Sequence, residues 1–378
     1  MIENQQEKKV EYLELIYDLI FVYMIGRNNS LLHYVEDGFV PGIVFLAYVL
    51  CTLAVIQIWN FSTFYINVYG RNGVRDHVFL CINMFLLYFM GDGTSAQWED
   101  TFYKYTIAWT LIFVNLGIQH LIEARNHRDA PWEIRQLYQK AAIIFSEAAL
   151  IVVHIVVYTL TGVSIAAVPI LFGIVAMTIS ARRGVLVPVD FAHLSERAML
   201  YVVFTFGEMI IAISGYFAGD MSFNTIYFAA MAFLIVVGLF LSYGTMYNKI
   251  LDRELLTDGV SYMAIHIFLI FALNNISTAL EFMREEEIQL LPKTLFLTAS
   301  FVIYFLFLFM TGKYAKLRCR FSRRFILRMF LIGVSFVILM LLLRENMYLN
   351  IALTVAYIFG IFGLVYKMGK ASEECEEE

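Results

Sequence analysis

The chain has 378 residues, of which 60% are hydrophobic and only 16% are charged, and its formal net charge is −5. Soluble domains carry about 25% charged and about 45–50% apolar residues. The composition therefore excludes a soluble enzyme, a disordered chain and a nucleic-acid-binding protein, and it predicts a helical protein that crosses a membrane several times. Part of the acidic excess lies in the C-terminal tail, at Glu373, Glu374, Glu376, Glu377 and Glu378.

Twelve apolar segments are long enough to cross a membrane, because a helical span needs about 20 mostly apolar residues. None shows the period-two alternation of a membrane-spanning strand. We therefore expect an all-α polytopic bundle of about twelve transmembrane helices. The segments cover approximately residues 11–33, 41–68, 76–97, 102–124, 138–160, 163–181, 193–217, 222–249, 258–281, 291–312, 324–343 and 347–368.

The distribution of lysine and arginine predicts the orientation of these spans. With the N-terminus in the cytosol, 21 of the 27 basic residues fall in cytosolic segments and five in outer loops and outer helix ends. The remaining one, Arg197, lies just inside the seventh span. This excess follows the positive-inside rule. An added or missing span would reverse the later loops and remove the asymmetry, so we expect twelve spans with both termini in the cytosol.

A weak internal repeat relates the two halves of the chain. At an offset of 182 residues the polar matches include Glu14 with Glu196, Tyr65 with Tyr247, Arg71 with Arg253 and Asp76 with Asp258. Six spans per half insert with the same orientation, which predicts a parallel duplication of the kind found in some transporters. We expect a cytosolic N-terminus (1–10), a first six-helix repeat (11–181), a cytosolic linker (182–190), a second six-helix repeat (191–370) and an acidic cytosolic tail (371–378).

The stretch 313–328 contains seven basic residues. Each lysine or arginine beside a membrane gains roughly 1 kcal/mol near acidic lipid head groups. The loop therefore either binds anionic lipid or serves only to fix the orientation of the neighbouring spans.

Two motifs resemble those of the bacterial low temperature requirement A (LtrA) family. Residues 14–22 read ELIYDLIFV, close to the family pattern E-L-F-F/Y-D-L-V-F-V in the first helix. Residues 193–197 read HLSER and residues 207–208 read GE, which match the later pattern H-x-x-E-R and G-E. The departures are Ile16 in place of an aromatic residue and Met209 in place of a small polar one. The resemblance implies a multi-spanning protein of the bacterial plasma (inner) membrane, in a family whose biochemical activity is not established.

Ionisable side chains inside apolar segments are the best candidates for a functional site, because a charge near a helix centre costs about 2.5–3.5 kcal/mol. Glu14 and Asp18 lie four residues apart and share one face of the first helix. They predict either a proton or cation site, or a structural arrangement in which Asp18 pairs with an arginine of another helix. Arg197, Arg71 and Arg253 are the candidate partners.

Glu208 is the deepest acidic residue, because a rise of about 1.5 Å per residue from Ser195 places it about 20 Å into the membrane. On the repeat offset it aligns with Gly26, the neighbour of Arg27. If the two halves pack about a pseudo-twofold axis, Arg27 and Glu208 lie at similar depth. We therefore predict an ion pair or a shared cavity between these two side chains.

Histidines supply further candidates. His193 and Glu196 are three residues apart on one helix face, a spacing that binds metal in some helical bundles. A capping and ion-pair role at the start of the helix is the simpler interpretation. Glu147 and His154, two turns apart in the fifth span, are either part of a proton relay or satisfied groups of the core. His266 in the ninth span poses the same alternative.

The pattern favours membrane transport, in which protons or another small solute pass through a polar site between the two repeats. The residues of this site are Glu14, Asp18, Arg27, His193, Glu196, Arg197 and Glu208. The alternatives are a cation channel, an intramembrane enzyme, and a structural or sensory membrane subunit. No motif identifies a cofactor or a metal site, and no residue is assigned a catalytic role, so an enzyme is the less favoured class. Substrate, coupling ion, direction and oligomeric state stay open.

Overall fold

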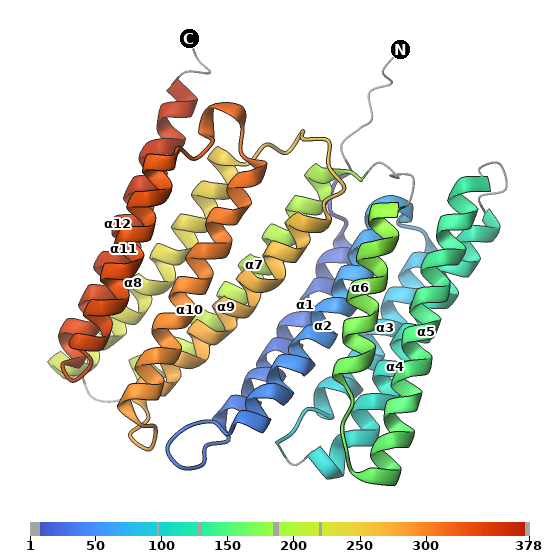
Figure 1. Cartoon of the computed structure of the whole chain (residues 1–378), viewed down its shortest axis with the longest axis horizontal. Helices are drawn as coiled ribbons and strands as arrows, with labels where there is room; N and C mark the ends of the chain where they lie inside the picture. Colours follow the sequence, from blue (N-terminus) through green and yellow to red (C-terminus); the bar gives the residue numbers. More distant parts are fainter. Residues whose placement is uncertain (1–7, 97, 127–130, 184–188, 219–220, 375–378) are drawn as a thin grey trace. The chain divides into compact units, whose positions relative to one another are not determined.

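The computed structural model describes residues 8–96, 98–126, 131–183, 189–218 and 221–374, which form twelve α-helices and no strand (Figure 1). The expected all-α class is confirmed. The helices are α1 (Tyr12–Asn29), α2 (Gly42–Tyr69), α3 (Val74–Asp92), α4 (Trp98–Asn126), α5 (Pro131–Thr161), α6 (Ala167–Arg183), α7 (Phe191–Ala212), α8 (Phe223–Thr245), α9 (Val260–Arg284), α10 (Leu290–Met310), α11 (Arg323–Leu342) and α12 (Met347–Glu374).

Ten helices in the described part of the chain are long and apolar enough to cross a membrane. The chain is therefore a polytopic helical membrane protein. The other two are α1, whose 18 residues include Glu14, Asp18 and Arg27, and α6, which has 17 residues. Helix number agrees with the sequence pattern, and the crossing of the membrane by α1 and α6 stays a prediction.

The chain divides into two compact units. The first consists of Met1–Tyr34, Val40–Arg197 and Leu256–Met263, and the second of Val35–Phe39, Ala198–Leu255 and Ala264–Glu378. The two-repeat arrangement stays a prediction. Of the segments that border the predicted repeats, residues 1–7, 184–188 and 375–378 lie outside the described part of the chain.

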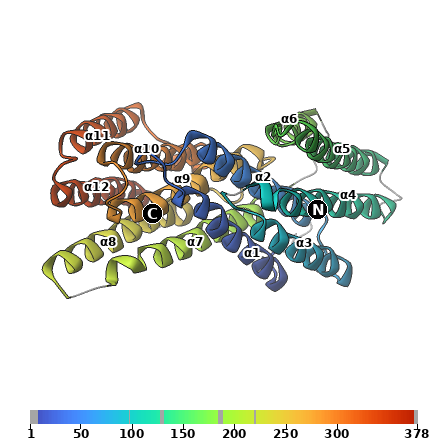
Figure 2. The same ribbon diagram turned by 90° about the horizontal axis from the view of Figure 1, so that it is seen from below.

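In the first unit, α1 packs against α2 and α3, α4 packs against α3 and α5, and α6 contacts α2 and α5 (Figures 1 and 2). Large aromatic side chains fill the space between these helices. Trp59, Trp109, Tyr17 and Phe113 are each at most 1% exposed. This packing fixes the faces of α1 and α2 that carry the polar residues described below.

In the second unit, α12 packs against α8 and α11. This unit also includes a tight turn at Val35–Phe39, in which Asp37 (φ 52°) and Gly38 (φ 83°) take the left-handed conformation. Positive φ at two successive residues is typical of a type I′ turn, for which Asp-Gly is a favoured pair. The Gly38 carbonyl accepts a hydrogen bond from the backbone N–H of Gln289 at 2.8 Å.

Candidate functional site

Two helices of the first unit bring four ionisable side chains into one buried cluster. Glu14 and Asp18 lie one turn apart on α1, and His193 and Arg197 lie one turn apart at the start of α7. Residues four apart point to the same side of a helix, so each helix presents two of the four groups. Asp18, His193 and Arg197 are completely buried and Glu14 is 5% exposed. We refer to these four side chains as the α1–α7 cluster.

Arg197 and Asp18 of the cluster form a bidentate ion pair. The Arg197 guanidinium donates from Nε to Asp18 Oδ2 at 3.3 Å, and from Nη2 to Asp18 Oδ1. The indole Nε1–H of Trp59 donates a third hydrogen bond to Asp18 Oδ1 at 2.9 Å. Paired N–H groups that meet a carboxylate in this way give the strongest and most directional ion pairs. Arg197 is thus the partner of Asp18 among the three arginines that the sequence suggested.

Glu14 makes weaker contacts within the cluster than Asp18 does. Glu14 Oε2 lies 3.2 Å from His193 Nε2 and 3.5 Å from Arg197 Nη1. The second distance is an ion pair without hydrogen-bond geometry, and Nη1 makes no hydrogen bond to any described residue. A buried guanidinium therefore keeps an unused donor next to Glu14.

Asn67, near the end of α2, determines which ring nitrogen of His193 carries the proton. The backbone N–H of Asp190 can only donate, and it meets Asn67 Oδ1 at 3.1 Å. This contact fixes the amide orientation, so Asn67 Nδ2 faces His193 Nδ1 at 3.0 Å and also donates to the Asp190 carbonyl at 2.8 Å. Nδ1 must then accept, which leaves the proton of a neutral imidazole on Nε2. His193 therefore donates its Nε2–H to Glu14.

Asp190 and Lys8 lie next to the cluster, near the start of α7. Asp190 caps α7, because its Oδ1 accepts from the His193 backbone N–H at 3.0 Å. Its Oδ2 accepts from the Lys8 backbone N–H at 3.2 Å. The Lys8 ammonium binds carbonyls at the end of α2, including Gly70 O at 2.9 Å. Burial lowers the pKa of the Lys8 ammonium, while the negative charge of Glu14 opposes this shift.

A second ion-pair group lies elsewhere in the first unit, around the buried Glu123. The Glu123 carboxylate of α4 pairs with Arg75 and, at 3.7 Å, with Arg71. The Tyr65 hydroxyl donates to Glu123 Oε2 at 3.3 Å. Arg71 is therefore a partner of Glu123 rather than of Asp18. Arg253, the third candidate partner of Asp18, stacks its guanidinium over the Tyr247 ring at 4.7 Å.

Arg27 and Glu208 belong to different units. Arg27 Nε donates to the Gly91 carbonyl at 3.0 Å, at the end of α3 in the first unit. Glu208 lies half-buried on α7 within the second unit, where Glu281 is the neighbouring charge that acts on it. The Arg27–Glu208 pair stays a prediction. Glu196 is half-buried, and the capping role considered for this part of α7 belongs to Asp190.

The secondary candidates lie in separate places. Glu147 and Gln57 converge on Gly173 of α6, since Glu147 Oε2 and Gln57 Nε2 both occupy the space that a Cβ on Gly173 would need. His154 is completely buried and accepts a hydrogen bond from the Ile165 backbone N–H at 3.2 Å. His266, in the second unit, lies 3.1 Å from the Tyr243 hydroxyl through Nε2.

Sequence reasoning did not single out Trp59, Asn67, Asp190 or Lys8. Asp190 carries a usable signal, because an acidic residue directly before an amphipathic run is typical of a helix N-cap. The indole N–H of Trp59 also needs an acceptor wherever it is buried. Within the described chain, no group of three or more His, Cys, Asp or Glu side chains has the geometry to hold a metal ion.

In the described residues, ten helices long and apolar enough to span a membrane and a buried cluster of ionisable groups define a polytopic helical membrane protein with an internal polar site. The model of the family described as Bacterial low temperature requirement A protein (LtrA) matches residues 9–358. The chain belongs to the LtrA family, as its two motifs indicated. The matched range includes all four residues of the α1–α7 cluster. No curated protein and no solved structure matches the chain.

Proposed function

We propose that this protein transports protons, alone or with a small solute, and that the α1–α7 cluster is the site that takes up the proton. The observation that carries the proposal is the charge balance of the cluster. Glu14 and Asp18 bring two negative charges and Arg197 brings one positive charge, while Asn67 holds His193 neutral. One negative charge is left over, and an uncompensated buried charge is costly. Uptake of one proton removes that cost.

The partners of the cluster explain why other charges do not supply the balance. The nearby Lys8 ammonium acts on Glu14 through space, but its direct contacts are the carbonyls at the end of α2, and its backbone N–H donates to Asp190. Arg75 and Arg71 are engaged by Glu123. The proton is thus the small cation that the site accepts without rearrangement, and the unused Nη1–H of Arg197 provides a donor for a passing water or solute.

A flux assay tests this function. The purified full-length protein is placed in liposomes that contain a pH-sensitive dye, and a potassium gradient with valinomycin drives proton entry. We expect Glu14→Gln to abolish proton flux, because the amide oxygen keeps the hydrogen bond from His193 while the excess charge disappears. The matched control is Glu123→Gln, which neutralises a buried carboxylate of the same unit outside the cluster. It should retain flux if its melting curve shows that it is folded.

The complete burial of Asp18, His193 and Arg197 favours a second candidate, a structural clamp between α1, α2 and the start of α7. The same assay separates the two functions. If folded Glu14→Gln transports protons as fast as the wild-type protein, or if the wild-type protein carries no flux above empty liposomes, the transport proposal is wrong and the clamp is favoured.

The orientation of the chain and its lipid contacts belong to the same proposal. The distribution of lysine and arginine supports cytosolic termini in the bacterial inner membrane. In the segment 313–328, six of the seven basic side chains are exposed: Lys313, Arg318, Arg320, Arg323, Arg324 and Arg328. This exposure supports binding of anionic lipid. Native mass spectrometry with phosphatidylglycerol should show fewer bound lipids after Arg323→Gln/Arg324→Gln, and equal occupancy would exclude this site.

A further inference from the structure

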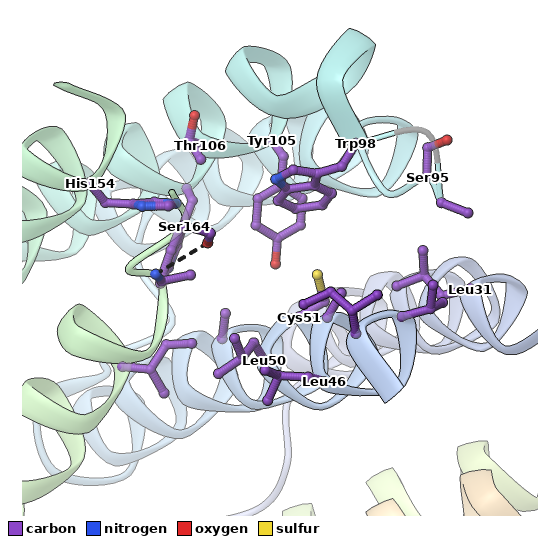
Figure 3. A pocket seen from close by; sticks show the side chains of 18 residues that line it. Leu31, Leu46, Leu50, Cys51, Ser95, Trp98, Tyr105, Thr106, His154 and Ser164 are labelled. Carbon is purple, nitrogen blue, oxygen red and sulfur yellow. Dashed lines mark hydrogen bonds between the residues drawn. The ribbon is translucent and has the colours of Figure 1, made fainter. Parts of the chain in front are cut away.

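A separate cavity of about 260 Å³ lies inside the first unit (Figure 3). Helices α2, α4 and α5 and the start of α6 enclose it. Cavities of roughly 150 Å³ lined by apolar side chains bind benzene, so this one has room for a ring that carries a substituent. None of the residues of the α1–α7 cluster lines it.

The wall is predominantly apolar and carries no formal charge. None of the described residues that line it is Asp, Glu, Lys or Arg. A charged ligand would lose its hydration without gaining a partner, which is costly. The occupant must therefore be uncharged. The aliphatic part of the wall includes Leu31, Leu46, Leu50, Ala54 and Ile170.

His154 contributes a buried donor to this wall. Its Nδ1 accepts from the Ile165 backbone N–H, so the proton of the neutral ring is on Nε2. Nε2 is buried and has no hydrogen-bond partner in the described chain. The ring is held in place by edge contact with Phe102 at 5.2 Å. A buried donor without a partner is costly, and a ligand that accepts the hydrogen bond would remove that cost.

Trp109 contributes a second donor. It also lines the cavity, is 1% exposed, and its Nε1–H has no acceptor among the described residues. An indole nitrogen can only donate. In Figure 3 the Tyr105 hydroxyl is directed toward the Cys51 side of the cavity, where it adds a polar group of adaptable orientation. The polar atoms of the wall thus call for an acceptor on the ligand.

Part of the cavity wall reaches the surface of the first unit. Two of its lining residues, Ile43 and Leu46, are 74% and 49% exposed. Both are apolar and lie on a helix that is long and apolar enough to span the membrane. Ala96 and Ser164, which also line the cavity, are exposed as well. The preference for a lipid-soluble occupant therefore follows from the predominantly apolar wall.

We propose that this cavity binds a small, uncharged, lipid-soluble molecule whose carbonyl oxygen accepts hydrogen bonds from His154 and Trp109. The apolar wall holds the hydrocarbon part, and the two N–H groups orient the oxygen. The site is independent of the proton-transport proposal, because it shares no residue with the α1–α7 cluster.

Binding is tested with two probes of the same skeleton. Acetophenone is a neutral aromatic ketone, and ethylbenzene carries a CH2 group in place of its carbonyl. Isothermal titration calorimetry of the full-length protein in lipid nanodiscs, with empty nanodiscs as reference, measures both. We expect one acetophenone per chain, bound about five- to thirtyfold more tightly than ethylbenzene, as one or two net hydrogen bonds provide.

Two variants assign the site. His154→Leu should bind both probes equally, whereas His120→Leu should keep the preference for the ketone, since His120 is a buried histidine of the same unit that bonds Leu116 and does not line the cavity. If His154→Leu does not fold, Trp109→Phe provides the same comparison. The proposal is wrong if wild-type protein binds neither probe, if it does not distinguish them, or if its preference survives in His154→Leu or in Trp109→Phe.

Discussion

Replacement of Arg197 by methionine removes the only positive charge of the α1–α7 cluster. Methionine has a comparable length and no charge, so the change leaves Asp18 and Glu14 buried without their cation. At the 3.5 Å that separates Arg197 Nη1 from Glu14 Oε2, unit charges attract by about 5 kcal/mol at an effective dielectric constant of about 20. Desolvation offsets part of this attraction. We expect a loss of about 3–5 kcal/mol in unfolding free energy, as for other buried pairs that lose one partner.

Asp18→Asn should cost less, about 1–3 kcal/mol. Asparagine still accepts the Trp59 hydrogen bond, and Arg197 retains Glu14 as a counter-charge. The double variant should be more stable than the sum of the two losses predicts, because neither residue then leaves the other unpaired.

Unfolding by sodium dodecyl sulfate in mixed micelles, followed by circular dichroism, measures all four proteins of this cycle. If Arg197→Met lies within about 0.5 kcal/mol of the wild-type protein, the change behaves like a surface substitution. The account of the cluster as a tightly coupled buried group would then be refuted.

Three further predictions concern the surroundings of the cluster. In ¹⁵N NMR spectra of the folded protein at neutral pH, His193 should show the neutral Nε2–H form, and Asn67→Asp should convert it to the doubly protonated ring by offering Nδ1 an acceptor; an unchanged spectrum would contradict the assigned tautomer. Gly173→Ala should destabilise the protein by about 1–3 kcal/mol because the new methyl group meets two side chains, whereas Gly207→Ala, with open space, should leave it unchanged or up to about 1 kcal/mol more stable; equal melting temperatures would exclude this clash. Asp190→Ala should cost about 0.5–2 kcal/mol through loss of the α7 cap, and thermal unfolding that matches the wild type would show that the cap contributes nothing.

Much of the fold could be predicted because the membrane constrains it strongly. Apolar length alone identified all twelve helices of the described chain to within several residues, since a span must satisfy its backbone internally. Apolar length does not decide whether the two shortest α-helices, α1 and α6, cross the membrane. Three ionisable residues in α1 lower its mean hydropathy, so pattern cannot distinguish a crossing helix from one that is buried among others.

The site could be predicted in part. Glu14, Asp18 and Arg197 stand out because charge is scarce in apolar segments, and Arg197 was among the possible partners of Asp18. The choice between Arg197, Arg71 and Arg253 depends on contacts between residues up to 179 positions apart, which spacing along the chain does not encode. The 260 Å³ cavity could not be predicted either, because it arises from imperfect packing of helices whose individual sequences read as ordinary core.

The Asn67 amide holds two things at once, the main chain of Asp190 at the start of α7 and the proton position on His193. Any shift of α7 along α2 that breaks the backbone contacts frees the amide to turn over, and its oxygen can then accept from a protonated imidazole. The position of α7 and proton binding at His193 are therefore coupled. By thermodynamic linkage, if the shift of α7 makes proton binding more favourable, proton binding favours the shift of α7 by the same free energy.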